Sequence, residues 1–483
     1  MNLPRNPVIR LLASTALGCA LLAAVIIYLS AVSIAAARDP RLNDLYGHWA
    51  LLTLSAALAV NIILATALRV PFRPARLGAW CSHAGVIVLM GAAAWYAAFH
   101  VSGECLTMAD QGRWSAIDHF FVNDTYAIFV STDPRQAPVQ TPLGVPGRLN
   151  ASLAGLPEGF SGSADLFLPR AELAPRWQND SPAASPAVIL QIDDLGHSQR
   201  VTLCPDEPEY QQFGGRGYAM IYYPDSDPRQ VEQLAKPAAG DRGPGMPYDV
   251  AMVLSGPQVS PVLVVVRPDG SRWKGDLDRG RELAVPLAGR TVGVTLLERL
   301  DHASLTWDAQ AVAGASAAAV PAVRVTIRGS GFERTSFLPF ASFENASAPL
   351  RMDLGGGKTI WLNFSRRRVD LPATVQVTAT QYLTHPGTSV PQDYICEVTI
   401  AAGGLRRQET LRLNEPVQVG AYQLSQGSWQ SGPDGRVATI RLLVASRPAL
   451  WLIWTACAMI CAGLLYGFYA KPLLMRRAGK EGA

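Results

Sequence analysis

One histidine, His83, lies inside a long stretch without charged side chains and is the first candidate for chemistry. The stretch, Gly78 to Ala98, has 21 residues and no Asp, Glu, Lys or Arg. About 20 apolar residues suffice to cross a bilayer as a helix, and a titratable side chain within a span is costly enough to suggest a function. Neutral imidazole is a good ligand for haem iron, and Ile87 and Met90 on the same helical face suit a flat apolar macrocycle. The residues alone leave two interpretations open, an iron ligand or a packing residue hydrogen-bonded to a neighbouring helix, or to a Ser or Thr.

Two other histidines, His48 and His100, lie at the ends of predicted spans, both on the same side of the membrane. They either anchor helix ends in the interface or form a second, outer haem site. The remaining four are expected to be surface residues of the long middle region: His119, His197, His302 and His385.

The seven cysteines carry no redox motif. Four lie within apolar runs, and Cys105, Cys204 and Cys396 lie outside them, so at most one disulfide can form among these three. No CxxC pair and no CxxCH occur, which excludes by motif a thioredoxin-like enzyme and covalent c-type haem on this chain. Cys457 and Cys461 share a helical face and are predicted to pack as small apolar residues.

Other catalytic motifs are missing. Gly355 to Thr359 reads GGGKT, but a P-loop needs a glycine where Met352 stands and a helix after it, whereas 360–364 is strand-like. Nucleotide binding is therefore rejected. No G-x-S-x-G elbow and no H-E-x-x-H zinc signature are present.

The elements that must position His83 are four apolar runs, predicted as transmembrane helices. They cover 11–37, 48–68, 78–98 and 448–470 of the 483 residues. A cleaved signal peptide is the alternative for the first run, but its 27 uncharged residues exceed the usual apolar core of about 7–15. Charged residues make up 17% of the chain, below the roughly 25% typical of soluble proteins. With a net charge of +4 and no basic face, a nucleic-acid partner is not expected.

The positive charges that flank these runs predict the topology. Arg5 and Arg10 precede the first run, three arginines lie between runs two and three, and four Lys and Arg lie in the tail 471–483. By the positive-inside rule these nine face the cytoplasm. Both termini are then cytoplasmic, and residues 99–447 form a large extracytoplasmic domain on the periplasmic or lumenal side.

That domain is predicted to be all-β, a sandwich or barrel. Short β-branched or alternating stretches recur, separated by Gly, Pro, Asp and Asn. They are 126–130, 187–192, 217–222, 262–266, 323–327, 358–364, 374–378, 394–400 and 437–444. The Ala-rich stretch 309–322 is predicted to be a linker that divides the domain, and 230–247, rich in Pro and Gly, is predicted to form little regular structure.

This layout resembles the ResB (CcsB) family of the system II route of cytochrome c maturation. Asn43 to Trp49, with Asn61 and Arg69, is similar to the family's second span, and His83-Ala84-Gly85 to Gly91-Ala92 is similar to H-x-G…G-A of its third. Leu413 to Pro416 with Gly420, Tyr422 and Gln426 is similar to N-x-P…G-Y…Q, and Ser446-Arg447-Pro448 leads into the last span. The sequence departs from the pattern at 65–67, where Ala-Thr-Ala stands instead of a Cys before the Arg.

The resemblance implies a subunit of a membrane complex that handles haem b. Its haem axial ligand would be His83. A separate CcsA or ResC-type subunit with a Trp-rich loop would be the partner, since the 11 Trp here are scattered. The complex would present haem outward to a reduced CxxCH apocytochrome c, with a thioredoxin-like reductant implied, and this chain would supply a ligand and a scaffold to a lyase-type complex. The alternative is a membrane-anchored scaffold with a β-rich interaction domain and no haem.

Overall fold

The computed structural model divides the chain into two compact units, 1–120 with 370–483 (unit 1) and 121–369 (unit 2). The boundary between them falls within two long strands, β3 (Ile117–Ser131) and β20 (Lys358–Thr384). The structure describes residues 6–38, 45–46, 48–110, 113–133, 135–144, 149–215, 217–224, 250–255, 261–267, 270–287, 289–312, 316, 318–343, 348–387, 391–431 and 437–472.

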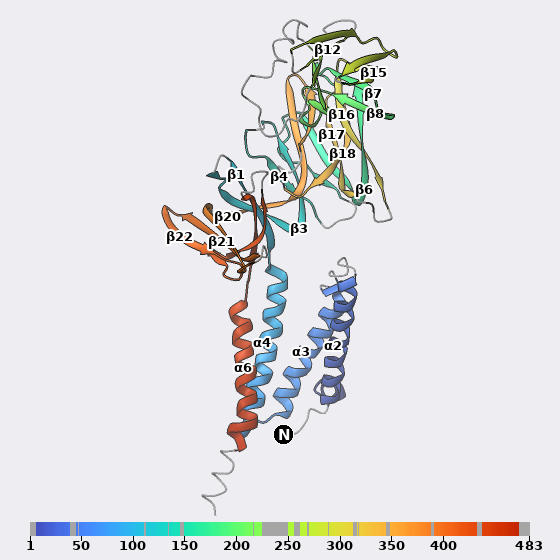
Figure 1. The fold of residues 1–483 in the computed structure, drawn as a ribbon. Coiled ribbons are helices and arrows are strands. Elements are labelled where there is room, and N and C mark those ends of the chain that lie inside the picture. Colours follow the sequence, from blue (N-terminus) through green and yellow to red (C-terminus); the bar gives the residue numbers. More distant parts are fainter. Residues whose placement is uncertain are drawn as a thin grey trace, which may run out of the picture. The chain divides into compact units, whose positions relative to one another are not determined.

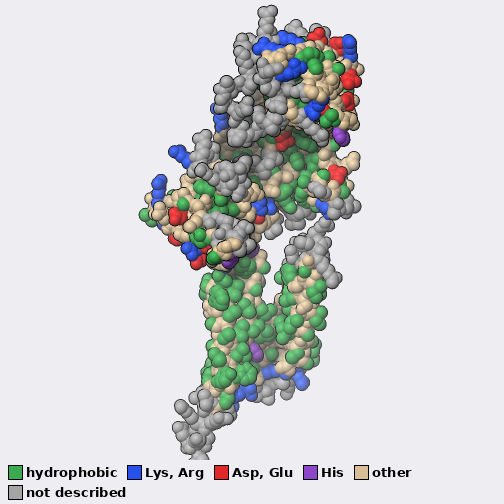
Figure 2. Space-filling model, in the orientation of Figure 1, with side chains coloured by type: hydrophobic (Ala, Val, Ile, Leu, Met, Phe, Trp, Pro, Cys, Tyr) green, Lys and Arg blue, Asp and Glu red, His purple; other side chains and the backbone are tan. Residues whose placement is uncertain are grey.

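Unit 1 carries four helices that are long and apolar enough to cross a membrane (Figure 1). They are α2 (Thr15–Arg38), α3 (Trp49–Arg69), α4 (Leu77–Phe99) and α6 (Leu450–Leu465), the last extended by the π-helical η4 (Tyr466–Ala470). The short helices α1 (Pro7–Leu12) and η2 (Pro74–Arg76) precede α2 and α4. Hydrophobic side chains cover the long helices, and Lys and Arg gather at one end (Figure 2).

The first helix begins later than predicted, because the run from residue 11 is interrupted. Leu12 ends α1, and α2 starts at Thr15. Asn61, buried in α3, donates from Nδ2 to the carbonyls of Leu12 (2.6 Å) and Ser14 (2.9 Å). Carbonyls at a helix end lack partners within the helix, and lipid offers none. The Asn61 amide therefore supplies the hydrogen bonds that these carbonyls need where the helix is interrupted.

Small residues at intervals of seven hold α4 against α6. Gly78 and Gly85 on α4 are buried, and a Cβ added to them would lie 2.6 Å from the carbonyl oxygen of Gly463 and 2.9 Å from that of Ala456. Ala92 is one heptad further and is also buried. The two helices therefore pack antiparallel with backbones in contact, as small residues permit within a membrane.

The helix pair α4 and α6 continues into a strand pair. β1 (Ser102–Asp110) leaves α4 and pairs antiparallel with β25 (Val437–Ser446), which leads into α6. The ladder runs from Ser102 opposite Ala445 to Met108 opposite Thr439. This pairing brings α6 back to α4, although more than 340 residues of chain separate them.

Unit 1 also contains the smaller strands around this ladder. They are β2 (Arg113–Trp114), β21 (Pro391–Ala402), β22 (Leu405–Leu411), β23 (Val417–Val419) and β24 (Tyr422–Ser431). β24 pairs with β25 and β23, and β21 lies between β22 and the second half of β20.

Unit 2 is built from three groups of strands. The first, β16-β6-β17-β18-β20 with β3, β4, β5 and β19, surrounds one apolar core. A five-stranded sheet, β13-β12-β11-β10-β9, and a four-stranded sheet, β14-β15-β7-β8, share a second core, so this part is a β-sandwich, as expected. The bounds are β4 (Val139–Pro142), β5 (Ala151–Ser152), β6 (Phe160–Asn179), β7 (Ala187–Asp194), β8 (His197–Leu203), β9 (Gln212–Gly215), β10 (Tyr218–Tyr223), β11 (Val250–Ser255), β12 (Val262–Val266), β13 (Arg272–Asp276), β14 (Glu282–Leu287), β15 (Arg290–Leu300), β16 (Ala303–Ala311), β17 (Val320–Gly329), β18 (Phe332–Ala341) and β19 (Leu350–Gly355).

The nine stretches predicted to be strands all contribute to strands, but the predicted linker at 309–322 is wrong. Its two ends belong to β16 and β17, and both of these strands pair with β6, so the segment connects neighbouring strands of one core. Residues 313–315 and 317 within it, and the whole of 230–247, lie outside the described residues. The prediction failed because the ends of this segment are held as strands by pairing with β6, a contact between distant parts of the chain that composition does not show.

Candidate functional site

The polar site within the apolar helices joins α3 to α4 through Thr66 and His83. The connection 70–76 is short, so the last turns of α3 face the first turns of α4. Thr66 Oγ1 lies 2.6 Å from the Ile62 carbonyl oxygen and 2.6 Å from His83 Nδ1. Thr66 is buried and His83 is half-buried.

These two contacts determine which nitrogen of His83 carries the proton. A carbonyl only accepts, so the single hydroxyl proton of Thr66 goes to Ile62, and Oγ1 must accept from Nδ1–H of His83. In the neutral ring the lone pair is then on Nε2, which bonds to no described residue. A histidine whose Nδ1–H is held by an acceptor and whose Nε2 is open has the arrangement found in metal-ligating histidines. His83 therefore has one ring nitrogen open to a ligand, and its bond to Thr66 is also the contact expected of a histidine that packs against a neighbouring helix.

His100, at the other end of α4, also has the proton of a neutral ring on Nδ1. Its contacts, however, join parts of the fold to one another. Its Nδ1 donates to the Ser446 carbonyl oxygen at 2.6 Å, and its ring stacks on Tyr96 at 4.6 Å. The Ser446 hydroxyl accepts from the Val101 amide at 2.8 Å. These bonds tie the start of β1 to the end of β25, where the helix pair becomes the strand pair.

His48 differs from both. It caps α3, and its Nδ1 accepts from the Ala50 amide at 3.3 Å, which places the proton of a neutral ring on Nε2. His48 thus offers no free lone pair in this conformation, whereas His100 does. The outer haem site stays a prediction, and the geometry favours His100 over His48 as its ligand. His83 and His100 are 17 residues apart, about 25 Å along a helix, so they belong to separate sites.

The four histidines of the β-rich region are exposed or half-buried. His197, His302 and His385 are exposed, and His119 is half-buried with its Nδ1 2.5 Å from Asp118. No group of three or more His, Cys, Asp or Glu that could hold a metal ion occurs among the described residues. The GGGKT segment is the hairpin between β19 and β20 and has no helix after it.

All seven cysteines are free. Burial raises the pKa of the Cys105 thiol to about 12, that of Cys204 to about 11 and that of Cys396 to about 12. The thiolate is the reactive form, so these three thiols are inert at neutral pH.

The cysteines therefore give a direct prediction. In a variant with the four helix cysteines replaced by alanine, the folded chain should react with a thiol reagent at pH 8 more than about a hundredfold slower than an ordinary thiol. Unfolding should release three thiols per chain. A His197→Cys variant, with a cysteine at an exposed position, supplies the fast-reacting control, and rapid labelling without this change would contradict the buried placement.

The residues of the stretch that is similar to N-x-P…G-Y…Q have structural roles. Gly420 has φ 60°, and any Cβ there would lie 2.5 Å from Pro372. Tyr422 packs edge-on against Phe120, and Gln426 donates to the carbonyls of Tyr394 (2.6 Å) and Leu411 (2.8 Å). They join β24 to β21, β22 and β3. Asn43 lies outside the described residues.

Sequence reasoning included a Ser or Thr partner as the packing alternative for His83 but did not identify Thr66, and it did not identify Ser446 as the partner of His100. The signal for Thr66 was its hydroxyl near the end of the span that precedes the His83 helix, where a short connection brings the two helices together.

No protein-family model matches this chain, and no curated protein matches it either.

Proposed function

We propose that this chain is the haem-handling membrane subunit of a system II-type cytochrome c maturation complex, as its resemblance to the ResB family implies. The observation that carries the proposal is His83, held by Thr66 through Nδ1 and open at Nε2, in a helix without charged side chains. His83 would hold the iron and Thr66 would orient the ring. When bound, haem supplies the vinyl groups to which the two thiols of a reduced CxxCH apocytochrome c add.

The partner in this proposal is a CcsA or ResC-type subunit with a Trp-rich loop. The chain itself offers one open imidazole at the site, so a second axial ligand would come from that subunit. No acid–base role is assigned to the β-rich region, which would guide the apocytochrome or brace the partner. A thioredoxin-like protein would keep the apocytochrome thiols reduced.

The test is an absorption spectrum of the full chain, purified in detergent with its Trp-rich partner. A Soret band that copurifies with the complex is expected. A folded complex without haem would favour the alternative, a membrane-anchored scaffold whose β-rich region is an interaction domain.

The proposal includes a topology with both termini in the cytoplasm. It is supported by Arg69, which ends α3, by Arg73 and Arg76, which precede α4, and by Lys471, which follows η4. These positions place the four cations at the same end of the helices. The exposed Trp451 and Trp454 lie at the opposite end of α6, where aromatic side chains mark the second interface.

A reporter that is active only outside the cytoplasm tests this topology. Fused near residue 250 it should be active, and fused after Lys480 it should be silent. Because a cytoplasmic reporter should show the opposite pattern, the two together distinguish a wrong topology from poor expression. Activity of the outer reporter after Lys480 would overturn the four-span arrangement.

A further inference from the structure

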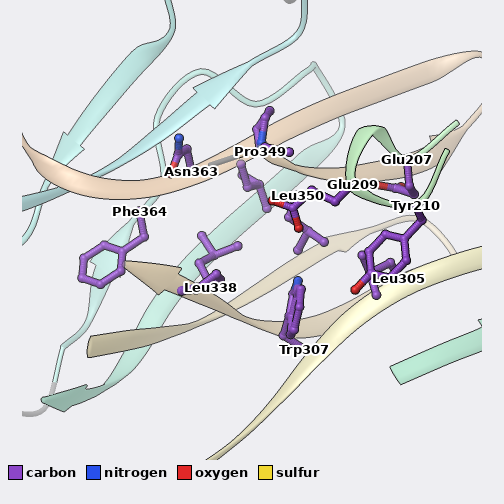
Figure 3. Close-up of a pocket in the computed structure, with 13 residues that line it drawn as sticks. Glu207, Glu209, Tyr210, Leu305, Trp307, Leu338, Pro349, Leu350, Asn363 and Phe364 are labelled. Atoms are coloured by element: carbon purple, nitrogen blue, oxygen red, sulfur yellow. The ribbon is translucent and has the colours of Figure 1, made fainter. Parts of the chain in front are cut away.

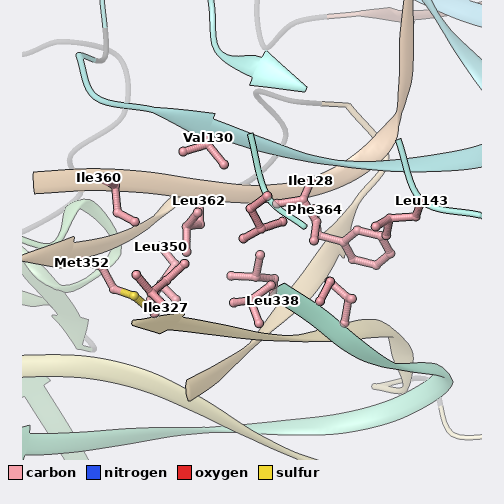
Figure 4. Close-up of a cluster of buried hydrophobic side chains, with 14 of the residues drawn as sticks. Ile128, Val130, Leu143, Ile327, Leu338, Leu350, Met352, Ile360, Leu362 and Phe364 are labelled. Atoms are coloured by element: carbon pink, nitrogen blue, oxygen red, sulfur yellow. The ribbon is translucent and has the colours of Figure 1, made fainter. Parts of the chain in front are cut away.

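A small pocket in unit 2 has no room for a ligand of more than a few atoms. It lies beneath the short helix η3 (Pro208–Tyr210) and has a volume of about 40 Å³, enough for a few water molecules (Figure 3). Leu338, Leu350 and Phe364 in its wall belong to the apolar core drawn in Figure 4. A more open binding surface lies in unit 1, at the end of the helices where Lys and Arg gather (Figure 2).

Four cations at this end of the helices have no acidic partner. Arg69 ends α3, Arg73 precedes η2 and Arg76 precedes α4, and all three are exposed. Lys471 follows η4. None of these four side chains bonds or pairs with a described residue. The reason is composition: the described residues of the helical part, 6–38, 45–46, 48–99 and 447–472, include no Asp or Glu.

The carboxylates of the strands are too far away to supply the missing charge. β1 begins after the opposite end of α4, and β25 ends before the opposite end of α6. The 23 residues of α4 rise about 35 Å as a helix. At physiological salt the Debye length is about 8 Å, so charges separated by a helix of this length are screened from one another. These cations therefore need counter-charges from a partner outside the chain.

The connection that carries the arginines is held in place by hydrogen bonds. The Arg76 amide donates to the Arg73 carbonyl oxygen at 2.8 Å and closes η2. The Tyr466 hydroxyl donates to the Pro74 carbonyl oxygen at 2.7 Å, so η4 holds the connection against α6. Because the backbone is already ordered, an anion bound by these arginines does not have to order it.

Exposed aromatic side chains lie among the cations. Phe72 is 77% exposed, and its ring meets that of Trp80 edge-on at 5.7 Å. Phe468 and Tyr469 on η4 are also exposed. Large rings beside arginines are unfavourable in water, but they suit the boundary between lipid headgroups and acyl chains.

We propose that this end of the helices binds the phosphate of an anionic phospholipid headgroup. Arg73 and Arg76 hold the phosphate, because a guanidinium donates two parallel hydrogen bonds to such a group. Arg69 and Lys471 add attraction, and Phe72 contacts the acyl chains. Free phosphate has the same charge but no acyl chains, so the exposed rings favour the lipid. The site uses neither haem nor His83, and its test is therefore separate from that of the proposed function.

The test is native mass spectrometry of the full chain, released from a non-ionic detergent after incubation with equal amounts of dioleoylphosphatidylglycerol and dioleoylphosphatidylcholine. Both lipids contain a phosphate, but only the first has a net negative charge. We expect phosphatidylglycerol to be retained at least about tenfold better, because each lysine or arginine near the membrane surface adds to the attraction. This preference should fall as the NaCl concentration of the incubation is raised.

Variants identify the cations responsible. Arg73→Gln should lower the preference by about fivefold, and Arg73→Gln combined with Arg76→Gln should abolish it. Arg447→Gln is the matched control, since it removes an exposed arginine just before the opposite end of α6 and should keep the wild-type preference. Circular dichroism of each variant verifies that the chain is folded.

Inorganic phosphate in large excess distinguishes the two sources of the anion. It should leave the lipid bound, because it lacks the acyl chains that contact Phe72. Complete displacement of the lipid by phosphate would overturn the assignment to a lipid. Equal retention of the two lipids by the wild type, or an unchanged preference in the folded double variant, would also overturn the proposal.

Discussion

Replacing His83 with alanine should remove or shift the Soret band of the purified complex and lower the yield of c-type cytochromes by about tenfold or more. The reason is that His83 is the side chain in the charge-free helix whose Nε2 lone pair is open to a ligand. Loss of a group that merely orients a metal ligand already costs about 10–100-fold in affinity, and loss of the ligand should cost at least as much. The measurements are the absorption spectrum and the haem-stained cytochrome yield in cells.

Thr66→Val separates a ligand from a packing residue. Valine keeps the shape but cannot accept the Nδ1–H bond, so the ring loses its orientation and haem retention should fall while the helices stay packed. His302→Ala, at an exposed position outside the helices, should leave spectrum and yield unchanged. An unchanged spectrum in His83→Ala, or equal yields in His83→Ala and His302→Ala, would make His83 a packing residue.

The parts of the fold that follow from local pattern could be predicted from the sequence. Charge-free runs long enough to span a bilayer became helices, and β-branched stretches such as 262–266 became strands, because both depend on neighbouring residues. The break after Leu12 escaped prediction since its cause, Asn61, lies about 50 residues away. Apolar composition alone does not reveal where a distant amide interrupts a helix.

The sites depend on contacts that spacing does not encode. His83 was identified from its unusual position, yet its role as donor or acceptor depends on Thr66 and on where the hydroxyl proton goes. Such features become visible only when the helices are placed.

The contact between α4 and α6 leads to the second large expected effect. Gly463→Leu should strongly destabilise the helical part of unit 1, because an added Cβ would meet the Gly78 carbonyl oxygen at 2.6 Å and would also press on Ser82. Overpacking usually costs about 1–3 kcal/mol, and here the obstacle is backbone, which cannot change rotamer, so a loss of at least about 3 kcal/mol is expected. Thermal unfolding of the full chain in non-ionic detergent, followed by circular dichroism, measures it.

Gly467→Leu is the matched control, because this glycine lies four residues further along the same chain segment and a Cβ there meets nothing within 4 Å. The same comparison is available on α4, where Gly85 faces Ala456 and Ile460 while Gly91 faces open space. Leucine should therefore be tolerated at Gly91 and Gly467 and harmful at Gly85 and Gly463. Equal stability of all four variants would mean that the small residues do not hold the helices together. A loss confined to Gly85 and Gly463 would instead establish the antiparallel register, since these are the positions at which backbone meets backbone.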